Sequence, residues 1–202
     1  MNLANHLKTL IFQATPHGRN TRKMYNVSSF PDKQEDNAES TRNLLMPANL
    51  RLALYEPDIP QNTGAIMRMA ACMGVDVDII EPCGFVLDDR KLRRAVMDYI
   101  DHVDMTLHTG WPAFQQAHVG ARRVLLTTKA ADFYTGFAFA PGDVLLLGSE
   151  TGGVPAAAHN AVAARIAIPM APGLRSLNLV VAAAMVLGEA LRQLDAFPGG
   201  AR

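Results

Sequence analysis

Hydrophobic and polar positions follow two different periods from Leu50 onward. Short apolar runs rich in Val, Ile and Leu, such as LRLALYE and DVLLL, are typical of buried strands. Longer segments with apolar residues three and four positions apart lie between these runs and indicate helices. Strands are predicted at 50–56, 75–80, 103–107, 122–128, 143–147 and 165–168. Helices are predicted at 64–73, 88–99, 111–118, 155–163 and 176–194.

The starts of three predicted helices carry local signals. Asp88 and Asp89 open the helix at 88–99, Pro155 opens the next-to-last helix, and Ser176 is expected to be the N-cap of the last one. Strands that alternate with helices predict an α/β fold, with a parallel sheet flanked by helices on both faces. In such a sheet ligands bind at the carboxyl ends of the strands.

The first 46 residues have a different character. They are polar, rich in Asn, Ser and Thr, and lack the periodicity of a strand or a long helix. We expect a disordered extension over 1–46 and one folded domain over 47–202. Residues 1–31 contain four basic residues and no acid, so an organelle transit peptide is a second, weaker interpretation.

Composition narrows the possible partners. The chain has 19 basic and 19 acidic residues, so no global field attracts nucleic acid and any RNA contact must use a local basic patch. The longest apolar run, Leu179 to Leu187, is far shorter than the ~20 residues of a membrane-spanning helix. Cys72 and Cys83 have no CxxC spacing, and free thiols in a reducing cytosol are expected, with no metal and no membrane contact.

Three loops rich in Gly and Pro follow three of the predicted strands: EPDIPQNTG, GSETGGVP and IPMAPGLRSLN. If the strands are parallel, these loops lie at the same edge of the sheet. None contains the GxGxxG of a dinucleotide fold or the GK[ST] of a phosphate-binding loop. A nucleotide-binding oxidoreductase is therefore a weak alternative.

Arg68 is the only charged residue between Ala65 and Met73. A solvated helix face would carry several charges, and a helix packed in the core should carry none. Arg68 therefore requires either a buried partner, such as a structural salt bridge, or a ligand.

Taken together, the segments LALYEPDIPQNTGAIMRMAACMG, IIEPCGFVLDDRKLRRAVMDY, LLTTKA, LLLGSETGGVP and IPMAPGLRSLNL resemble the SPOUT superfamily of RNA methyltransferases. Within it they look like the TrmL-type subgroup, which methylates the ribose 2′-hydroxyl of the tRNA wobble nucleotide, position 34. The resemblance covers Leu50 to Leu194. It implies a deep trefoil knot in the C-terminal part of the α/β fold, S-adenosyl-L-methionine as the methyl donor, and a cytoplasmic homodimer that acts on the anticodon stem-loop of tRNA.

The resemblance also implies roles for particular residues. Main-chain groups of Leu126, Gly148, Ile168 and the turn leading to Ser176 would hold the cofactor. The catalytic positions that match are Asn62, Arg68, Glu150, Ser176 and Asn178. Arg68 would lie beside the loops instead of pointing to water, either as a base or, as we favour, as a cation that binds phosphate and stabilises the developing alkoxide.

Contact with RNA is also expected at the densest basic cluster, in the predicted helix 88–99. Its members are Arg90, Lys91, Arg93 and Arg94. A solvated helix face is the alternative for this cluster. For the protein as a whole, two further alternatives remain: methylation of another tRNA or rRNA ribose, and an RNA-binding protein of the same fold without catalytic activity.

Overall fold

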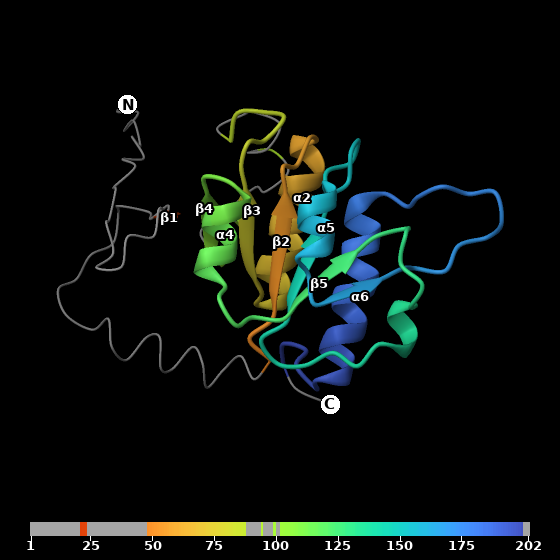
Figure 1. The fold of residues 1–202 in the computed structure, drawn as a ribbon. Helices are drawn as coiled ribbons and strands as arrows, with labels where there is room; N and C mark the ends of the chain where they lie inside the picture. Colours follow the sequence, from red (N-terminus) through yellow and green to blue (C-terminus); the bar gives the residue numbers. More distant parts are fainter. Residues whose placement is uncertain (1–20, 24–47, 88–93, 95–98, 100–101, 200–202) are drawn as a thin grey trace, which may run out of the picture.

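The computed structural model describes residues 21–23, 48–87, 94, 99 and 102–199. Within these residues seven strands form one sheet in the order β1-β4-β3-β2-β6-β5-β7 (Figure 1). The strands are β1 (Thr21–Lys23), β2 (Arg51–Tyr55), β3 (Asp76–Ile80), β4 (Met105–His108), β5 (Arg123–Leu126), β6 (Val144–Leu147) and β7 (Ala164–Ile166). β2 to β7 run parallel, and β1 pairs antiparallel with β4 at one edge. The predicted parallel sheet is confirmed.

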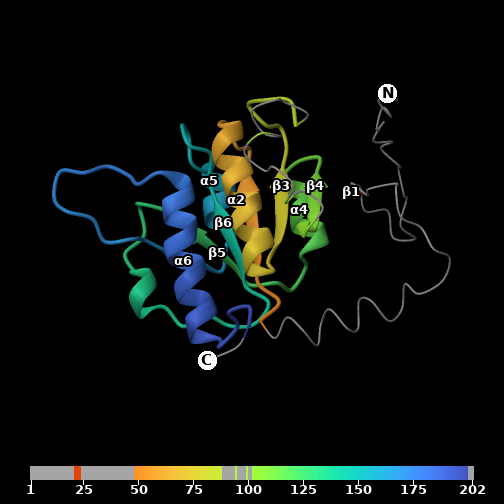
Figure 2. The same ribbon diagram turned by 180° about the vertical axis from the view of Figure 1, so that it is seen from behind.

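Helices cover both faces of the sheet. They are α2 (Pro60–Met73), α4 (Trp111–Ala117), α5 (Ala156–Asn160) and α6 (Leu179–Gln193), with a short 3-10 helix, η2 (Tyr134–Gly136). α2 and α6 pack on one face, in front in Figure 2, whereas α4 and α5 lie on the other, in front in Figure 1. Among the described residues no helix is long and apolar enough to cross a membrane.

The central strand β2 shows how the sequence builds two cores. Leu52 and Leu54 belong to the core under α2 and α6, and Ala53 and Tyr55 to the core under α4 and α5. Successive side chains of a strand point to opposite faces, so both sets are buried. A parallel sheet covered on both faces therefore gives the nearly continuous apolar run of this strand.

Several predicted boundaries need correction. α2 begins at Pro60, four residues before the predicted start, because proline is well tolerated in the first turn of a helix. The predicted N-cap of the last helix, Ser176, is wrong: α6 begins at Leu179, and the N-cap is Asn178. Asn178 Oδ1 accepts hydrogen bonds from the backbone N–H groups of Val180 (2.8 Å) and Val181 (3.4 Å).

Some predictions fall outside the described residues. The helix predicted at 88–99 does so, apart from Arg94 and Tyr99. The extension predicted over 1–46 also lies outside them, apart from β1, which the sequence analysis did not predict.

Candidate active site

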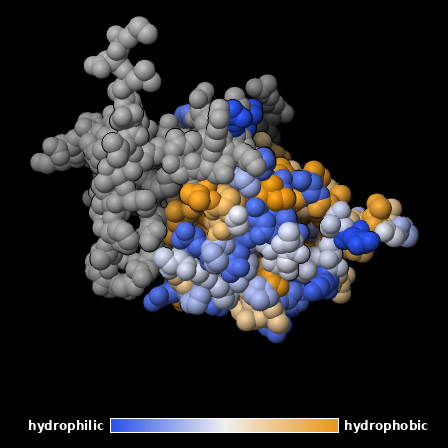
Figure 3. All heavy atoms as spheres, turned by 90° about the horizontal axis from the view of Figure 1, so that it is seen from above, coloured by the Kyte–Doolittle hydropathy of each residue, from blue (hydrophilic) through white to orange (hydrophobic). Residues whose placement is uncertain are grey.

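A cavity of about 460 Å³ opens at the carboxyl ends of β5, β6 and β7. Its size suits a small-molecule ligand. Figure 3 looks down on this edge of the sheet, where apolar and polar areas lie side by side and the segment 169–178 projects to the right. Seven of the residues singled out in the sequence line the cavity: Asn62, Leu126, Gly148, Glu150, Ile168, Ser176 and Asn178. The prediction that the three loops meet at one edge is confirmed.

Backbone forms much of the wall on the side of the loop after β6. Ser149 and Gly153 pair through two backbone hydrogen bonds of 2.9 Å, so this loop folds back on itself. A Cβ atom on Gly148 would lie 2.6 Å from the carbonyl carbon of Gly153. No side chain fits there, which explains the glycine and leaves main-chain groups facing the cavity.

A chain of hydrogen bonds beside the cavity connects the loop after β6 with the starts of α2 and α6. Asn62 Nδ2 donates to Glu150 Oε1 at 3.0 Å. Asn178 Nδ2 in turn donates to Asn62 Oδ1 at 3.2 Å. Because Asn178 also caps α6, the order Glu150–Asn62–Asn178 fixes the amide of Asn62 relative to both the loop after β6 and the start of α6.

Arg68 lies elsewhere. It is exposed and is not among the residues that line the cavity; its guanidinium lies over the ring of Tyr99, 4.9 Å from the centroid. The expectation that it projects beside the loops and away from water is therefore wrong for a single chain. Six residues along an α-helix rotate the side chain by about 240°, so Arg68 and Asn62 face different directions on α2.

Of the basic cluster predicted to contact RNA, only Arg94 lies within the described residues, and it is exposed. Arg90, Lys91 and Arg93 lie outside them. RNA binding at this cluster stays a prediction.

Among the cavity residues that were not predicted, two carry a basic side chain: Lys129 and His159. Lys129 belongs to the segment LLTTKA, where a lysine directly after a predicted strand was the available signal. His159 lies in the short helix α5 and carries no sequence signal of its own. Arg165 Nε donates to His159 Nδ1 at 3.1 Å and to the backbone carbonyl of His159 at 2.9 Å, so Nδ1 is an acceptor here.

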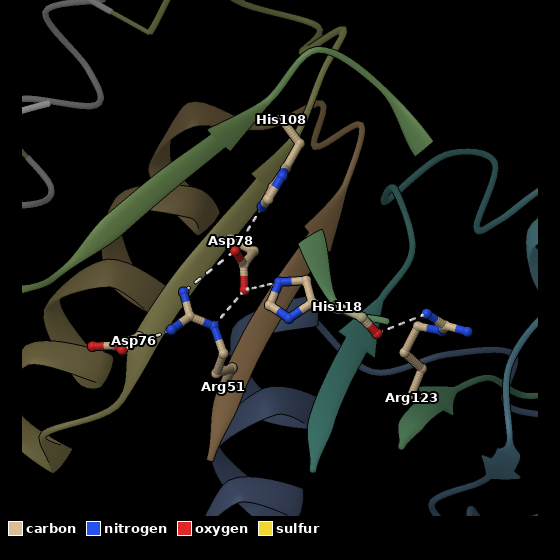
Figure 4. Close-up of polar contacts among 6 residues, drawn as sticks. All are labelled: Arg51, Asp76, Asp78, His108, His118 and Arg123. Carbon is tan, nitrogen blue, oxygen red and sulfur yellow. Dashed lines mark hydrogen bonds and ion pairs between the residues drawn. The ribbon is translucent and has the colours of Figure 1, made fainter. Parts of the chain in front are cut away.

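A second polar cluster is buried away from the cavity, around Asp78 (Figure 4). Arg51 Nε and His108 Nε2 each lie 2.7 Å from a carboxylate oxygen of Asp78, and His118 Nε2 lies 3.2 Å from one. Burial raises the pKa of Asp78, but the contacts with His108, His118 and Arg51 outweigh burial and hold the pKa well below its usual range.

The same cluster offers a donor set that a metal ion can use. One ligand atom each from Asp78, His108 and His118 lies within 4.8 Å of the other two. The guanidinium of Arg51, however, already donates to both carboxylate oxygens of Asp78, at 2.7 and 3.3 Å. A fixed cation at the carboxylate opposes a second one, so we interpret the cluster as a structural network.

Comparison with known proteins identifies the family. The sequence profile of the SpoU rRNA Methylase family matches residues 49–188. The chain belongs to this family. One relative is the tRNA (cytidine(34)-2'-O)-methyltransferase of Beijerinckia indica subsp. indica. The two sequences are 56% identical over 147 residues, which cover 72% of this chain and 92% of the relative.

Solved structures of other proteins agree with this assignment. One is described as structural insights into the 2-OH methylation of C/U34 on tRNA. It is 41% identical to this chain, with a TM-score of 0.71, and the match covers 73% of this chain and 97% of the solved one. Another is the SpoU methyltransferase AviRb of Streptomyces viridochromogenes in complex with the cofactor AdoMet. It is 25% identical, with a TM-score of 0.64 over 72% of this chain and 58% of its own.

Proposed function

We propose that this SpoU methylase transfers a methyl group from S-adenosyl-L-methionine to the ribose 2′-hydroxyl of the wobble nucleotide, position 34, of tRNA. The observation that carries the proposal is the meeting of Asn62, Glu150 and Asn178 at a cavity walled by loop backbone. The names of relatives that match over nearly their whole length support cytidine or uridine at this position as the substrate, and we propose that the uridine is a modified one.

The cavity fits the proposed cofactor. Gly148 leaves backbone exposed where any side chain would collide, and main-chain groups can then recognise a polar nucleoside. Leu126 and Ile168 supply apolar wall for a flat base, and Ser176 also lines the cavity. When bound, the cofactor supplies a methyl group already activated by the sulfonium. The protein therefore has to align the acceptor hydroxyl and help to remove its proton.

Glu150 holds the amide of Asn62 in one orientation, which suits Asn62 for fixing the acceptor ribose beside the cavity. Arg68 is the proposed cation at the phosphate of the target nucleotide. Because Arg68 lies outside the cavity of its own chain, we place it at the cavity of a second copy in the proposed homodimer, where its positive charge would orient the ribose and stabilise negative charge on the attacking oxygen. Ser176 and Asn178 shape the cavity at the start of α6.

A homodimer is part of the proposal, because α6 has a second apolar face. Ala183, Val186 and Leu187 are buried against the sheet, whereas Val181, Ala184 and Met185 are exposed. These exposed residues follow the three- and four-residue spacing of one helix face. A second copy that covers this face would bring new groups to the edge of the cavity. Both subunits would then contact the anticodon stem-loop, whose phosphates would be bound by Arg90, Lys91, Arg93 and Arg94.

The resemblance to the SPOUT superfamily supports three further proposals. Residues 47–202 form the methyltransferase domain, and 1–46 form an extension. The C-terminal part contains a deep trefoil knot. The protein works in the cytoplasm, where tRNA is modified.

The deciding experiment is methyl transfer from labelled S-adenosyl-L-methionine to total tRNA from cells that lack this gene, followed by mapping of methylated riboses. We expect label at position 34, and tRNA from the deletion strain should lack the 2′-O-methyl group at that position before the reaction. Label at another tRNA or rRNA ribose would support the related alternative instead. Calorimetry tests the other classes of function. Binding of NAD(P) but not of S-adenosyl-L-methionine would indicate an oxidoreductase. Binding of RNA, together with no methyl transfer in the labelling assay, would indicate a non-catalytic protein.

A further inference from the structure

The loop after β2 and the loop after β6 each contribute an acidic side chain that forms hydrogen bonds with the other loop. Asp58, in the first loop, accepts hydrogen bonds at Oδ2 from the backbone N–H (3.1 Å) and the hydroxyl (2.5 Å) of Thr151. Glu150, in the second loop, accepts at Oε2 from the backbone N–H of Asp58 (2.8 Å) and at Oε1 from Asn62 Nδ2. Each loop thus holds the other through an acidic side chain.

A third loop, which contains Gly84, packs against Asp58. Gly84 donates its backbone N–H to the carbonyl of Pro57 at 2.9 Å. A Cβ atom on Gly84 would lie 3.0 Å from Asp58 Cα and 3.2 Å from Asp58 Oδ1. A side chain at position 84 would therefore crowd Asp58, so glycine permits the close packing of this third loop against it.

The loop that Asp58 holds is the one whose backbone lines the cavity. It contains Gly148, Gly152 and Gly153, and glycine loses more conformational freedom on ordering than any other residue. A loop of this composition needs external contacts to keep one geometry before a ligand binds. Besides the bond from the backbone N–H of Asp58 to Glu150, the two hydrogen bonds from Thr151 to Asp58 Oδ2 tie this loop to the loop after β2.

We propose that Asp58 is a positioning residue that holds the loop 148–153 in its cofactor-binding geometry and, through Glu150, sets the orientation of Asn62. This inference rests on the proposed function. Its consequence is that cofactor affinity depends on a carboxylate outside the set of cavity-lining residues.

The test compares four variants with the wild type by calorimetry with S-adenosyl-L-methionine and by steady-state methyl transfer. Asp58→Ala removes the oxygen that accepts both hydrogen bonds from Thr151. The Kd for S-adenosyl-L-methionine should rise roughly tenfold or more, and kcat should fall because Asn62 loses its fixed orientation. Thr151→Val keeps only the backbone contact and should show a smaller rise. Thr151→Ser restores the hydroxyl and should bind like the wild type. Glu189→Ala removes a carboxylate at the far end of α6, bound to Arg192, and should change neither constant.

Wild-type affinity in Asp58→Ala would overturn the inference, as would a Thr151→Ser variant as weak as Thr151→Val. A lower Tm of Asp58→Ala with unchanged Kd would also overturn it, because it would show a purely structural contact. These results leave the proposed function intact. Failure of the wild type to bind S-adenosyl-L-methionine would instead defeat the proposed function and, with it, this inference.

Discussion

Asn62 and Arg68 lie on the same helix, six residues apart, yet only Asn62 faces the cavity. The amide of Asn62 is held by Glu150 and Asn178, whereas the guanidinium of Arg68 stacks on Tyr99 at the surface. α2 therefore separates two tasks by rotation around its axis. One side contributes to the cavity, and the other presents a cation to whatever binds from outside.

Replacement of Arg68 tests this separation. Arg68→Ala should reduce methyl transfer by roughly 10²- to 10³-fold, the usual loss when one group that stabilises a developing oxyanion is removed. The Kd for S-adenosyl-L-methionine, measured by calorimetry, should not change, because Arg68 does not line the cavity. Arg192→Ala, at an exposed arginine of α6, serves as the control. Near-normal turnover of Arg68→Ala would remove the assigned role.

Gly148→Ala tests the backbone wall. The added methyl group would lie within 3 Å of three backbone atoms of Gly153, so the loop has to shift. We expect loss of measurable S-adenosyl-L-methionine binding in calorimetry while the protein stays folded by circular dichroism. Gly136→Ala is a suitable control, since a Cβ atom there meets nothing within 4 Å. Binding that survives in Gly148→Ala would show that the cofactor does not depend on this approach.

Asp78→Asn tests the buried network. The change removes the charge to which Arg51, His108 and His118 point, and loss of one partner of a buried ion pair costs about 3 kcal/mol or more. Urea denaturation should report this loss in the free energy of unfolding. Glu189→Gln, at an exposed ion pair with Arg192, should leave the free energy of unfolding close to that of the wild type.

The same carboxylate predicts how stability depends on pH. The pKa of Asp78 is held well below its usual range in the folded protein, whereas in the unfolded chain it is about 3.9. The unfolded state therefore takes up the proton first, so the contribution of Asp78 is complete above about pH 5 and is lost as the pH falls further. Denaturation curves between about pH 6 and 3 should show a smaller acid-induced loss in Asp78→Asn than in the wild type. Equal slopes would contradict this account.

Met185→Glu tests the proposed dimer. Met185 and Val181 are 38% and 47% exposed on the outer face of α6, where a charge costs little in a monomer but opposes burial against a second copy. Light scattering should show a dimer for the wild type and a monomer for Met185→Glu. Arg192→Glu, near the end of the same helix, should stay dimeric. A monomeric wild type would refute the dimer directly.

The sheet was largely predictable because its strands are local patterns. Six short apolar runs mark β2 to β7, and burial on both faces leaves little ambiguity about them. The start of α6 was less accessible. Ser176 and Asn178 are both good N-cap residues, and the choice between them depends on the bond from Asn178 to Asn62, 116 residues away in the chain.

The candidate site was predicted from its sequence motifs. The errors in that prediction also have a physical cause. Asn62, Glu150 and Asn178 meet as expected because parallel strands deliver their loops to one edge. Arg68 was placed beside the loops by the resemblance and by its position after the start of the helix, and neither says toward which side its side chain points. The role of Asp58 depends on contacts with Thr151 and Gly84, which only the folded chain brings together.

β2 joins two polar systems that act independently. Its first residue, Arg51, serves the buried network, and the chain just beyond its last residue leads to Asp58 and the cavity. The network that stabilises the fold and the contacts that position the cavity loop thus lie at opposite ends of one short strand. A substitution that alters the loop near Asp58 is therefore expected to leave the ion pairs of Arg51 in place.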